Sequence, residues 1–294
     1  MDASGGRAMA ESKNICGAAA GTVAESQAAT YSRGMENSGV GWGMRVLALG
    51  AVWVGCVNLV WRQPGAWPRT FPLAYLPEGV VLGLFVAVAA VELGGGLALL
   101  APARMDRLLQ TGAGALCAAY GVITALTLPA IVRHPLIFAT WGGTGEELSR
   151  LAGAAIVIAL LRRRQALAWF WIFGLCVATF AGEQLAFFAR TMTLVPTWIP
   201  PSPWFWTVVT TIAFGLAAAA MLAGRRALLA ARLLTVMMVS FVPLIWIPLL
   251  IAQPHTLGNW LEGAETLSIA GACWVSADYL GGQTAKRKSS AAAD

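Results

Sequence analysis

The chain has 294 residues, of which 58% are hydrophobic and 12% are charged, and its mean hydropathy is +0.68. A soluble domain is roughly 25% charged, so this composition excludes a water-soluble globular protein. The net charge of +6 does not indicate a nucleic-acid partner, because the basic residues lie beside apolar segments, mainly on one expected side of a membrane.

The chain begins with about forty residues rich in Ala, Gly, Ser and Glu and without apolar periodicity. This composition predicts a disordered cytoplasmic tail over residues 1–42. No long apolar run precedes Gly43, so we expect no cleavable signal peptide. Met35 and Met44 both lie just before the first span, and a start at either would remove no predicted helix.

Eight apolar segments follow. Each approaches the ~20 residues that a helix needs to cross the roughly 30 Å hydrocarbon layer. The fourth is the shortest and spans only if Arg162, Arg163 and Arg164 reach the interface. The pattern predicts an all-α integral membrane protein with eight transmembrane helices over residues 44–61, 80–100, 111–132, 147–161, 167–189, 206–223, 227–252 and 260–280.

Landmarks of the first four segments recur in the last four at a constant offset of 119 residues. A fixed period of this kind indicates a duplication. We therefore predict two parallel four-helix bundles over 43–164 and 165–282, followed by a basic cytoplasmic tail over 283–294. The corresponding landmarks are Leu76-Pro77 and Val195-Pro196, Pro129 and Pro248, Pro135 and Pro254, Trp141 and Trp260, Glu146 and Glu265, and Ser149 and Ser268.

The basic residues predict the orientation of the chain. Fifteen of the twenty Lys and Arg residues fall on one side of the predicted membrane, and the positive-inside rule places that side, with both termini, in the cytoplasm. Because each unit has an even number of spans, the two units are parallel rather than inverted. The residues expected on the outer side are Arg62, Arg69, Arg133, Arg150 and Arg190.

The predicted outer loops carry many of the tryptophans, including Trp141 and Trp260. An indole favours the headgroup level, so these residues are interfacial anchors or, alternatively, an aromatic mouth for a flat lipophilic ligand. Residues 144–147 have the form of a capping box at the start of the fourth helix, which predicts a structural role for Glu147. Asn259 is a candidate N-cap of the eighth helix.

Two ionisable residues fall within predicted spans, where such residues are functional hypotheses by default. Glu92 lies near the middle of the second segment, and Glu183 lies about two turns from the outer end of the fifth. Both are expected to face the interior or a polar cavity. The alternative for Glu92 is structural, with its protonated carboxyl bonded to the helix that carries Tyr120 and Thr124.

Absent patterns exclude several classes of cofactor. The histidines, His134 and His255, lie in predicted outer loops, so a bis-histidine haem site within the membrane is excluded. No lysine lies within a predicted span, which excludes a retinal-type Schiff base. The sequence has no zinc spacing, phosphate loop or nucleophile elbow. We predict no covalent or metal cofactor and no self-contained catalytic site.

Several short motifs occur in a recognisable order. The first half contains Leu76-Pro77-Glu78 and Glu92-Leu93-Gly94-Gly95-Gly96-Leu97, and the second contains Gly182-Glu183-Gln184 and the helix entry from Trp260 to Leu267. Together they resemble the DoxX-like family, small bacterial four-helix membrane proteins related to DoxD and MauE, with two such units in one chain. The resemblance covers nearly all of the sequence after the tail.

The resemblance implies a location in the bacterial cytoplasmic (inner) membrane and an association with membrane oxidoreductase systems, including quinone-linked thiosulfate oxidation. A quinone would then be the ligand, and a soluble or membrane redox protein would be a partner besides the lipid bilayer. Second units of the family often read G-x-x-H-F in their first helix. Here that neighbourhood is Gly182-Glu183-Gln184-Leu185, so a role carried by the histidine does not transfer.

Three functions remain open at this point. The first is a quinone-interacting subunit of a membrane oxidoreductase, favoured by the resemblance. The second is a non-catalytic scaffold or partner subunit, favoured by the lack of cofactor ligands. The third is a transporter of a small lipophilic or weakly charged solute, favoured by buried carboxyl groups and a parallel repeat. The candidate ligand-binding or proton-handling residues are Glu92, Glu183, Gln184, Trp141, Trp260, Glu146 and Glu265.

The charge asymmetry generates a topology prediction. Reporter domains fused after Arg164 and after Leu280 should both report a cytoplasmic location, because both points follow an even number of spans. Paired reporters that are active on opposite sides of the membrane provide the measurement. A periplasmic signal at either point would contradict the parallel arrangement.

Overall fold

The computed structural model describes residues 41–63 and 73–291. The predicted tail over 1–42 lies outside the described residues except for Gly41 and Trp42, which begin the first helix. The regular elements in this part of the chain are all helical: α2 (Gly41–Trp61), η2 (Leu73–Tyr75), α3 (Glu78–Leu99), α4 (Asp106–Arg133), α5 (Phe138–Leu161), α6 (Leu167–Ala186), α7 (Phe188–Leu194), α8 (Pro203–Leu222), α9 (Ala227–Phe241), η3 (Val242–Trp246), α10 (Ile247–Ala252) and α11 (Leu257–Ala291).

The prediction of an all-α fold is confirmed for the described residues, and the character of the helices agrees with a membrane protein. Six helical stretches of the described chain are long and apolar enough to cross a membrane: α2, α3, α4, α6, α8 and the continuous stretch Ala227–Ala252 that joins α9, η3 and α10. The helices α5 and α11 are as long but carry several charged residues, so their apolar character is weaker. Where those charges lie decides how the site is built.

Both α5 and α11 begin earlier than the sequence patterns predict. α5 begins at Phe138, directly after the turn at Pro135, and the hydroxyl of Thr144 donates to the carbonyl of Thr140 at 2.8 Å within the helix. The predicted capping box at 144–147 is therefore wrong. α11 begins at Leu257, so Asn259 lies inside the helix rather than at its N-cap. Glu147 is consequently a residue of the helix interior.

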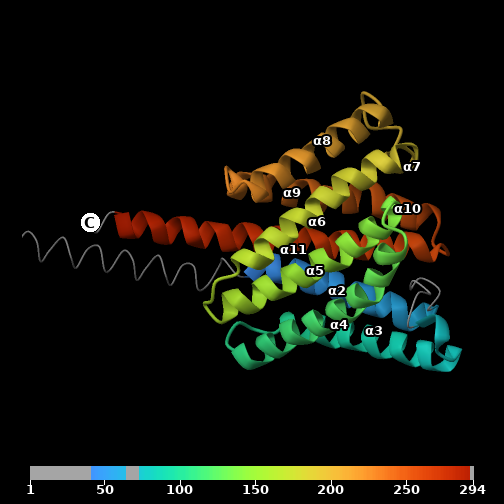
Figure 1. Cartoon of the computed structure of the whole chain (residues 1–294), viewed down its shortest axis with the longest axis horizontal. Coiled ribbons are helices and arrows are strands. Elements are labelled where there is room, and N and C mark those ends of the chain that lie inside the picture. Colours follow the sequence, from blue (N-terminus) through green and yellow to red (C-terminus); the bar gives the residue numbers. More distant parts are fainter. Residues whose placement is uncertain (1–40, 64–72, 292–294) are drawn as a thin grey trace, which may run out of the picture. The chain divides into compact units, whose positions relative to one another are not determined.

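Helices that follow one another in the chain pack side by side: α3 on α4, α4 on α5, α5 on α6, α6 on α8, and α9 on α11. α5 also packs on α11 (Figure 1). α2 packs on α3, because the backbone of α2 at Ala48 and Val52 lies against Gly96. The two halves of the chain thus meet through α5 with α6, α5 with α11, and α2 with α11.

The contact between α2 and α11 is unusually close. A Cβ at Gly271 would overlap the backbone of Leu47, and one at Gly50 would overlap Ser268. One turn from the contact of Leu47 with Gly271, towards the start of α2 and the end of α11, a Cβ at Gly43 would lie 2.8 Å from the backbone nitrogen of Val275. Helices in lipid associate mainly through van der Waals packing, which small residues allow by bringing two backbones together. The first and last long helices are held together in this way.

One corner of the chain recurs with the same geometry 119 residues later. At the end of α4 the amide of His134 donates to the carbonyl of Ala130 at 2.9 Å, and the amide of Gln253 donates to the carbonyl of Leu249 at 2.8 Å. The indole nitrogen of Trp141 donates to the carbonyl of Pro135 at 3.0 Å. Its counterpart in Trp260 donates to the carbonyl of Pro254 at 2.9 Å.

The corners differ in what precedes them. α4 runs through Pro129 as an α-helix, whereas the corresponding helix contains the π-helical turn η3 before Pro248. A π-turn places one extra residue in a helix and re-aims the side chains beside it. Trp246, the last residue of this turn, consequently points into the second half of the molecule and donates to the hydroxyl of Thr266 at 2.8 Å.

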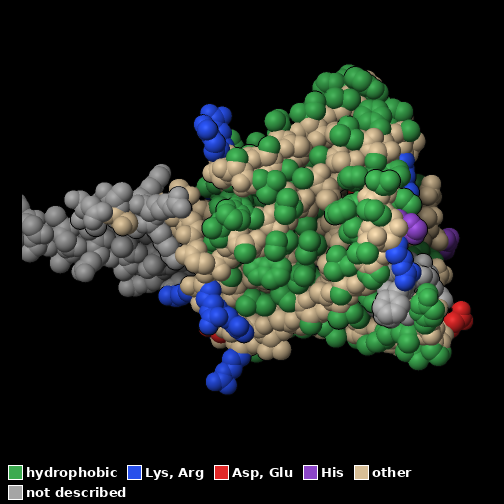
Figure 2. All heavy atoms as spheres, viewed as in Figure 1, with side chains coloured by type: hydrophobic (Ala, Val, Ile, Leu, Met, Phe, Trp, Pro, Cys, Tyr) green, Lys and Arg blue, Asp and Glu red, His purple; other side chains and the backbone are tan. Residues whose placement is uncertain are grey.

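Large apolar side chains cover the outward faces of the helices. Examples are Ile212 and Leu216 on α8 and Leu233 and Val236 on α9, all more than half exposed. Basic side chains gather towards the helix ends and leave a broadly apolar band between them (Figure 2). Exposed apolar surface of this extent is unfavourable in water, so the arrangement suits a hydrocarbon surrounding.

The close contact of α2 with α11 can be tested by adding one methyl group. Gly271→Ala should lower the thermal stability of the purified protein, by about 1–3 kcal/mol of unfolding free energy, because the helices must separate to admit the Cβ. Gly281→Ala, on the same helix, is the matched control, since a Cβ at that position meets nothing within 4 Å. Equal unfolding temperatures for both variants in detergent would contradict the close packing.

Candidate functional site

Two neighbouring cavities lie inside the helical unit. The larger cavity has a volume of about 960 Å³ and lies mainly among α6, α7, α8, α9, η3 and α11. The smaller cavity has a volume of about 470 Å³ and lies among α2, α3, α4, α5 and α11. The two cavities share the lining residues Ala139, Gly143, Glu146, Gly258 and Glu262, all from α5 and α11.

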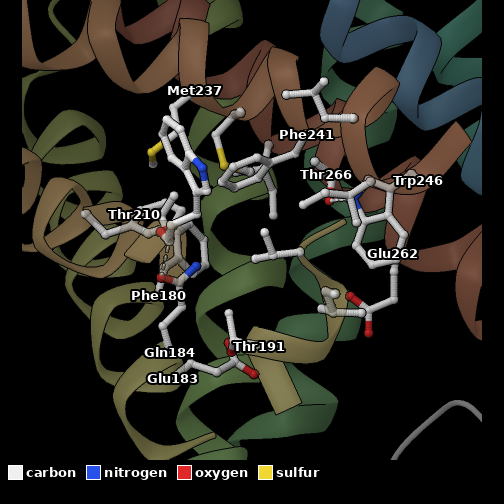
Figure 3. Close-up of a pocket in the computed structure, with 18 of the residues that line it drawn as sticks. Phe180, Glu183, Gln184, Thr191, Thr210, Met237, Phe241, Trp246, Glu262 and Thr266 are labelled. Atoms are coloured by element: carbon white, nitrogen blue, oxygen red, sulfur yellow. Dashed lines mark hydrogen bonds between the residues drawn. The ribbon is translucent and has the colours of Figure 1, made fainter. Parts of the chain in front are cut away.

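The larger cavity is amphipathic. Met237 and Phe241 lie at one end, and Glu183 and Thr191 lie at the other (Figure 3). Phe180 continues the apolar lining and makes an edge-to-face contact with Phe214, with ring centroids 5.8 Å apart. We call the two regions the apolar end and the acidic end, the acidic end being formed by Glu146, Glu183 and Glu262.

Glu183 reaches the acidic end because of a glycine on the facing helix. A Cβ at Gly142 of α5 would lie 2.7 Å from the Glu183 carboxyl carbon, so the carboxyl group rests against the α5 backbone. Glu146 lies one turn farther along α5. The expectation that Glu183 faces a polar cavity is thus confirmed.

Gln184 is held by two threonines of α8. Its side-chain oxygen accepts hydrogen bonds from Thr210 at 3.1 Å and from Thr211 at 2.9 Å. The amide lines the larger cavity but also ties α6 to α8, so it fixes one side of the cavity in place.

A cluster of three carboxyl groups stands where the two cavities adjoin. Glu146 on α5 and Glu262 and Glu265 on α11 have carboxyl oxygens that all lie within 4.8 Å of one another. Glu146 and Glu265 are the pair related by the 119-residue offset, so the structure brings the two equivalents together. Carboxyl groups this close cannot all be ionised unless a cation compensates their charge, and otherwise at least one of them holds a proton.

Arg150 supplies positive charge beside this carboxyl cluster. Its side chain is 1% exposed, and its Nη2 donates to Glu147 and, at 3.4 Å, to Glu265. The guanidinium carbon lies 5.0 Å from the centroid of the Tyr120 ring, which adds a cation–π contact. The guanidinium of Arg150 already faces the carboxyl cluster. We therefore assign the compensation of the cluster's negative charge to Arg150 and bound protons rather than to a metal ion.

The position of Arg150 corrects the charge count made from the sequence. That count placed Arg150 among the outer-side residues because the fourth helix was expected to begin at 147. The helix begins at Phe138, so Arg150 lies ~18 Å along it, in the interior rather than at an end. Of the other arginines in that count, Arg62 and Arg133 lie at helix ends, Arg190 lies in the short helix α7, and Arg69 lies outside the described residues.

Glu92 is buried in the smaller cavity, as expected, with 1% of its surface exposed. Neither carboxyl oxygen has a hydrogen-bond partner among the described residues, and the same holds for the hydroxyls of Tyr120 and Thr124. The predicted hydrogen bond from Glu92 to the helix that carries these two residues is therefore wrong. Glu92 instead lines the smaller cavity.

Trp141 and Trp260 line neither cavity. Both indoles bond to proline carbonyls at their corners, and Trp260 packs edge-to-face on Trp53, with ring centroids 6.3 Å apart. Their geometry matches the anchoring alternative. The tryptophans that line the larger cavity are Trp206, which was among those predicted at the outer helix ends, and Trp246, which the sequence patterns did not single out.

Sequence reasoning also missed Glu147, Arg150 and Glu262 as residues of the site. One signal was present: Glu147 and Arg150 are three residues apart, the spacing at which side chains meet on a helix. The same spacing joins Glu262 to Glu265. Reading both pairs as one polar face on each of two helices would have predicted that these faces pack together.

Comparisons with models of protein families, with curated proteins and with solved structures each found no match to this chain. The site is therefore interpreted from its own geometry.

The buried ion pair predicts an asymmetric mutational effect. Arg150→Met should lower the unfolding free energy by about 3 kcal/mol, the lower end for a buried pair, because the part-buried Glu147 and Glu265 would lose their cation. Arg150→Met combined with Glu147→Gln should recover part of that loss. Thermal unfolding of the purified protein measures both effects.

Arg164→Met is the matched control for Arg150→Met, since Arg164 is an exposed arginine just beyond the end of α5. It should change the unfolding free energy by less than about 0.5 kcal/mol. A double variant as unstable as Arg150→Met would show that the pair does not act as a unit.

Proposed function

We propose that this chain is a multi-pass protein of the bacterial cytoplasmic membrane, with eight spans in two parallel four-helix units and both termini in the cytoplasm. The recurrence of the Pro135 and Pro254 corners supports a duplicated origin. Counting α5 and α11 as spans is supported by the way their charged side chains face each other, with the guanidinium of Arg150 buried between the two helices. The resemblance to DoxX-like proteins agrees with this architecture.

We further propose that the larger cavity binds an amphipathic lipophile of the quinone class. The observation that carries this proposal is the division of one cavity into an aromatic, apolar end and an acidic end. A quinone has an apolar tail and ring that suit Phe180 and Phe241, and two carbonyl oxygens that accept hydrogen bonds from protonated carboxyl groups. Ligand sites of this kind are mostly apolar with a few convergent polar groups.

The chemistry of a quinone explains why carboxyl groups would stand at one end. Complete reduction of a quinone takes two electrons and two protons, and each proton must reach a carbonyl oxygen. Glu183 and Glu262 line the acidic end and carry groups able to donate them. The electrons would come from a partner redox protein, so the chain would act as the quinone-interacting subunit of a membrane oxidoreductase.

A second candidate is transport of a small lipophilic or weakly charged solute. It is favoured by one observation, the presence of two cavities that share Glu146 and Glu262. Transport predicts solute flux into liposomes that contain this chain alone, whereas a subunit of an oxidoreductase predicts ligand binding without flux. A non-catalytic scaffold predicts neither.

Binding can be tested by titrating the protein in lipid nanodiscs with a short-chain quinone and following tryptophan fluorescence. Phe241→Ala should weaken binding about tenfold, because it removes an aromatic wall of the apolar end. Trp171→Ala is the matched control, since this half-exposed aromatic of α6 lines neither cavity. Equal affinity in both variants, or no saturable binding in the parent, would contradict the proposal.

The proton role can be tested separately with an isosteric change. Glu183→Gln should bind the quinone within about threefold of the parent, because the amide keeps the shape and a hydrogen-bond donor. It should slow the rate of proton uptake during chemical reduction of the bound quinone, measured with a pH indicator in weak buffer. An unchanged rate of proton uptake in Glu183→Gln and in Glu92→Gln would remove both residues from the proposed role.

A further inference from the structure

The smaller cavity contains a concentration of unpartnered polar atoms. Both carboxyl oxygens of Glu92, one oxygen of Glu147, and Nε and Nη1 of Arg150 are buried without a hydrogen-bond partner among the described residues. All three side chains line this cavity. Buried polar groups in native proteins are nearly always hydrogen-bonded, to protein or to ordered water. So many free donors and acceptors around one space indicate that the space holds a hydrogen-bonding occupant.

Water is the occupant that fits these groups. Glu92 and Glu147 have unpartnered acceptors beside the cavity and Arg150 has unpartnered donors, and a water molecule both donates and accepts. A volume of about 470 Å³ exceeds the ~30 Å³ share of one water many times over. Threonines 127, 140 and 144 add further polar lining.

Two glycines lie at the boundary between the two cavities. Gly143 on α5 and Gly258 on α11 line both cavities, and a Cβ at either position would meet nothing within 4 Å. Glu146 and Glu262 stand at the same boundary. A chain of water molecules in the smaller cavity would therefore end at the carboxyl groups of the acidic end.

We propose that the smaller cavity is hydrated and conducts protons between Glu92 and the acidic end of the larger cavity, through the boundary at Gly143. The inference rests on the proposed function only for the destination of the protons, a bound lipophile. Each step breaks one O–H bond at a carboxylic acid or water and forms one at the next oxygen, so no electron moves and no co-reactant is consumed.

The charged and titratable groups around this path come from every helix that packs on it. Glu92 belongs to α3, Tyr120 to α4, and Glu146, Glu147 and Arg150 to α5. The facing groups on the other side are Glu262 and Glu265 of α11, with Glu183 of α6 and Arg190 of α7 lining the larger cavity. Arg150 stays positive throughout, and it stabilises the negative charge that a departing proton leaves on a carboxyl group.

Infrared spectroscopy of the ligand-free, full-length protein in nanodiscs tests the path without any assay of function. A protonated Glu92 gives a carboxylic C=O band, identified by its loss in Glu92→Gln, and the band shifts when its O–H becomes O–D in heavy water. The parent should exchange rapidly. Gly143→Leu should slow the exchange at least about tenfold, because the side chain fills the boundary without meeting other atoms.

Gly114→Leu is the matched control, since it adds the same side chain on α4. A Cβ at Gly114 also meets nothing within 4 Å, and Gly114 lines neither cavity. This variant should exchange like the parent. Slow exchange in the parent would show a dry cavity, rapid exchange in Gly143→Leu would show a separate route to solvent, and no Glu92 band would show an ionised group. Each result would overturn the proposal, whether or not quinone binds.

Discussion

Arg150 pairs with Glu147 on its own helix and with Glu265 on α11. These ion pairs constrain how the surrounding helices can pack. A charge in hydrocarbon costs at least ~2.5 kcal/mol and much more by other estimates, so α5 and α11 can lie in a membrane only with their polar faces turned towards each other. The remaining helices supply apolar cover around this contact. The ion pairs line the smaller cavity, and the larger cavity adjoins that space at Glu146 and Glu262, which line both.

The helical fold could largely be predicted from the sequence, because the signal is the length and apolar character of each segment. Each of the eight predicted segments coincides largely with helical residues of the described chain, although the fifth runs past the end of α6 at Ala186 and into α7. Helix ends were less well predicted. Residues 144–147 have the composition of a cap, yet the turn at Pro135 leaves the chain free to begin α5 at Phe138. A local pattern of two or three polar residues was outweighed by hydrogen bonds of a helix that had already started.

The candidate site could be predicted only in part. Burial of Glu92 followed from the cost of a carboxyl group in hydrocarbon, and the structure places it inside. The approach of Glu146 to Glu265 did not follow, because the offset says that two residues are equivalent and not that they touch. Their meeting depends on how the halves dock, through close contacts such as Gly271 with Leu47 that leave no mark in apolar periodicity.

The pairing of Arg150 has a consequence for biosynthesis. Synthesis runs from the N-terminus, so α5 is made before α11, and Arg150 is present before the Glu265 with which it also pairs. Glu147, three residues before Arg150 on the same helix, gives this guanidinium a partner within α5 itself. The ion pair of Arg150 with Glu147 therefore does not depend on α11 having been made.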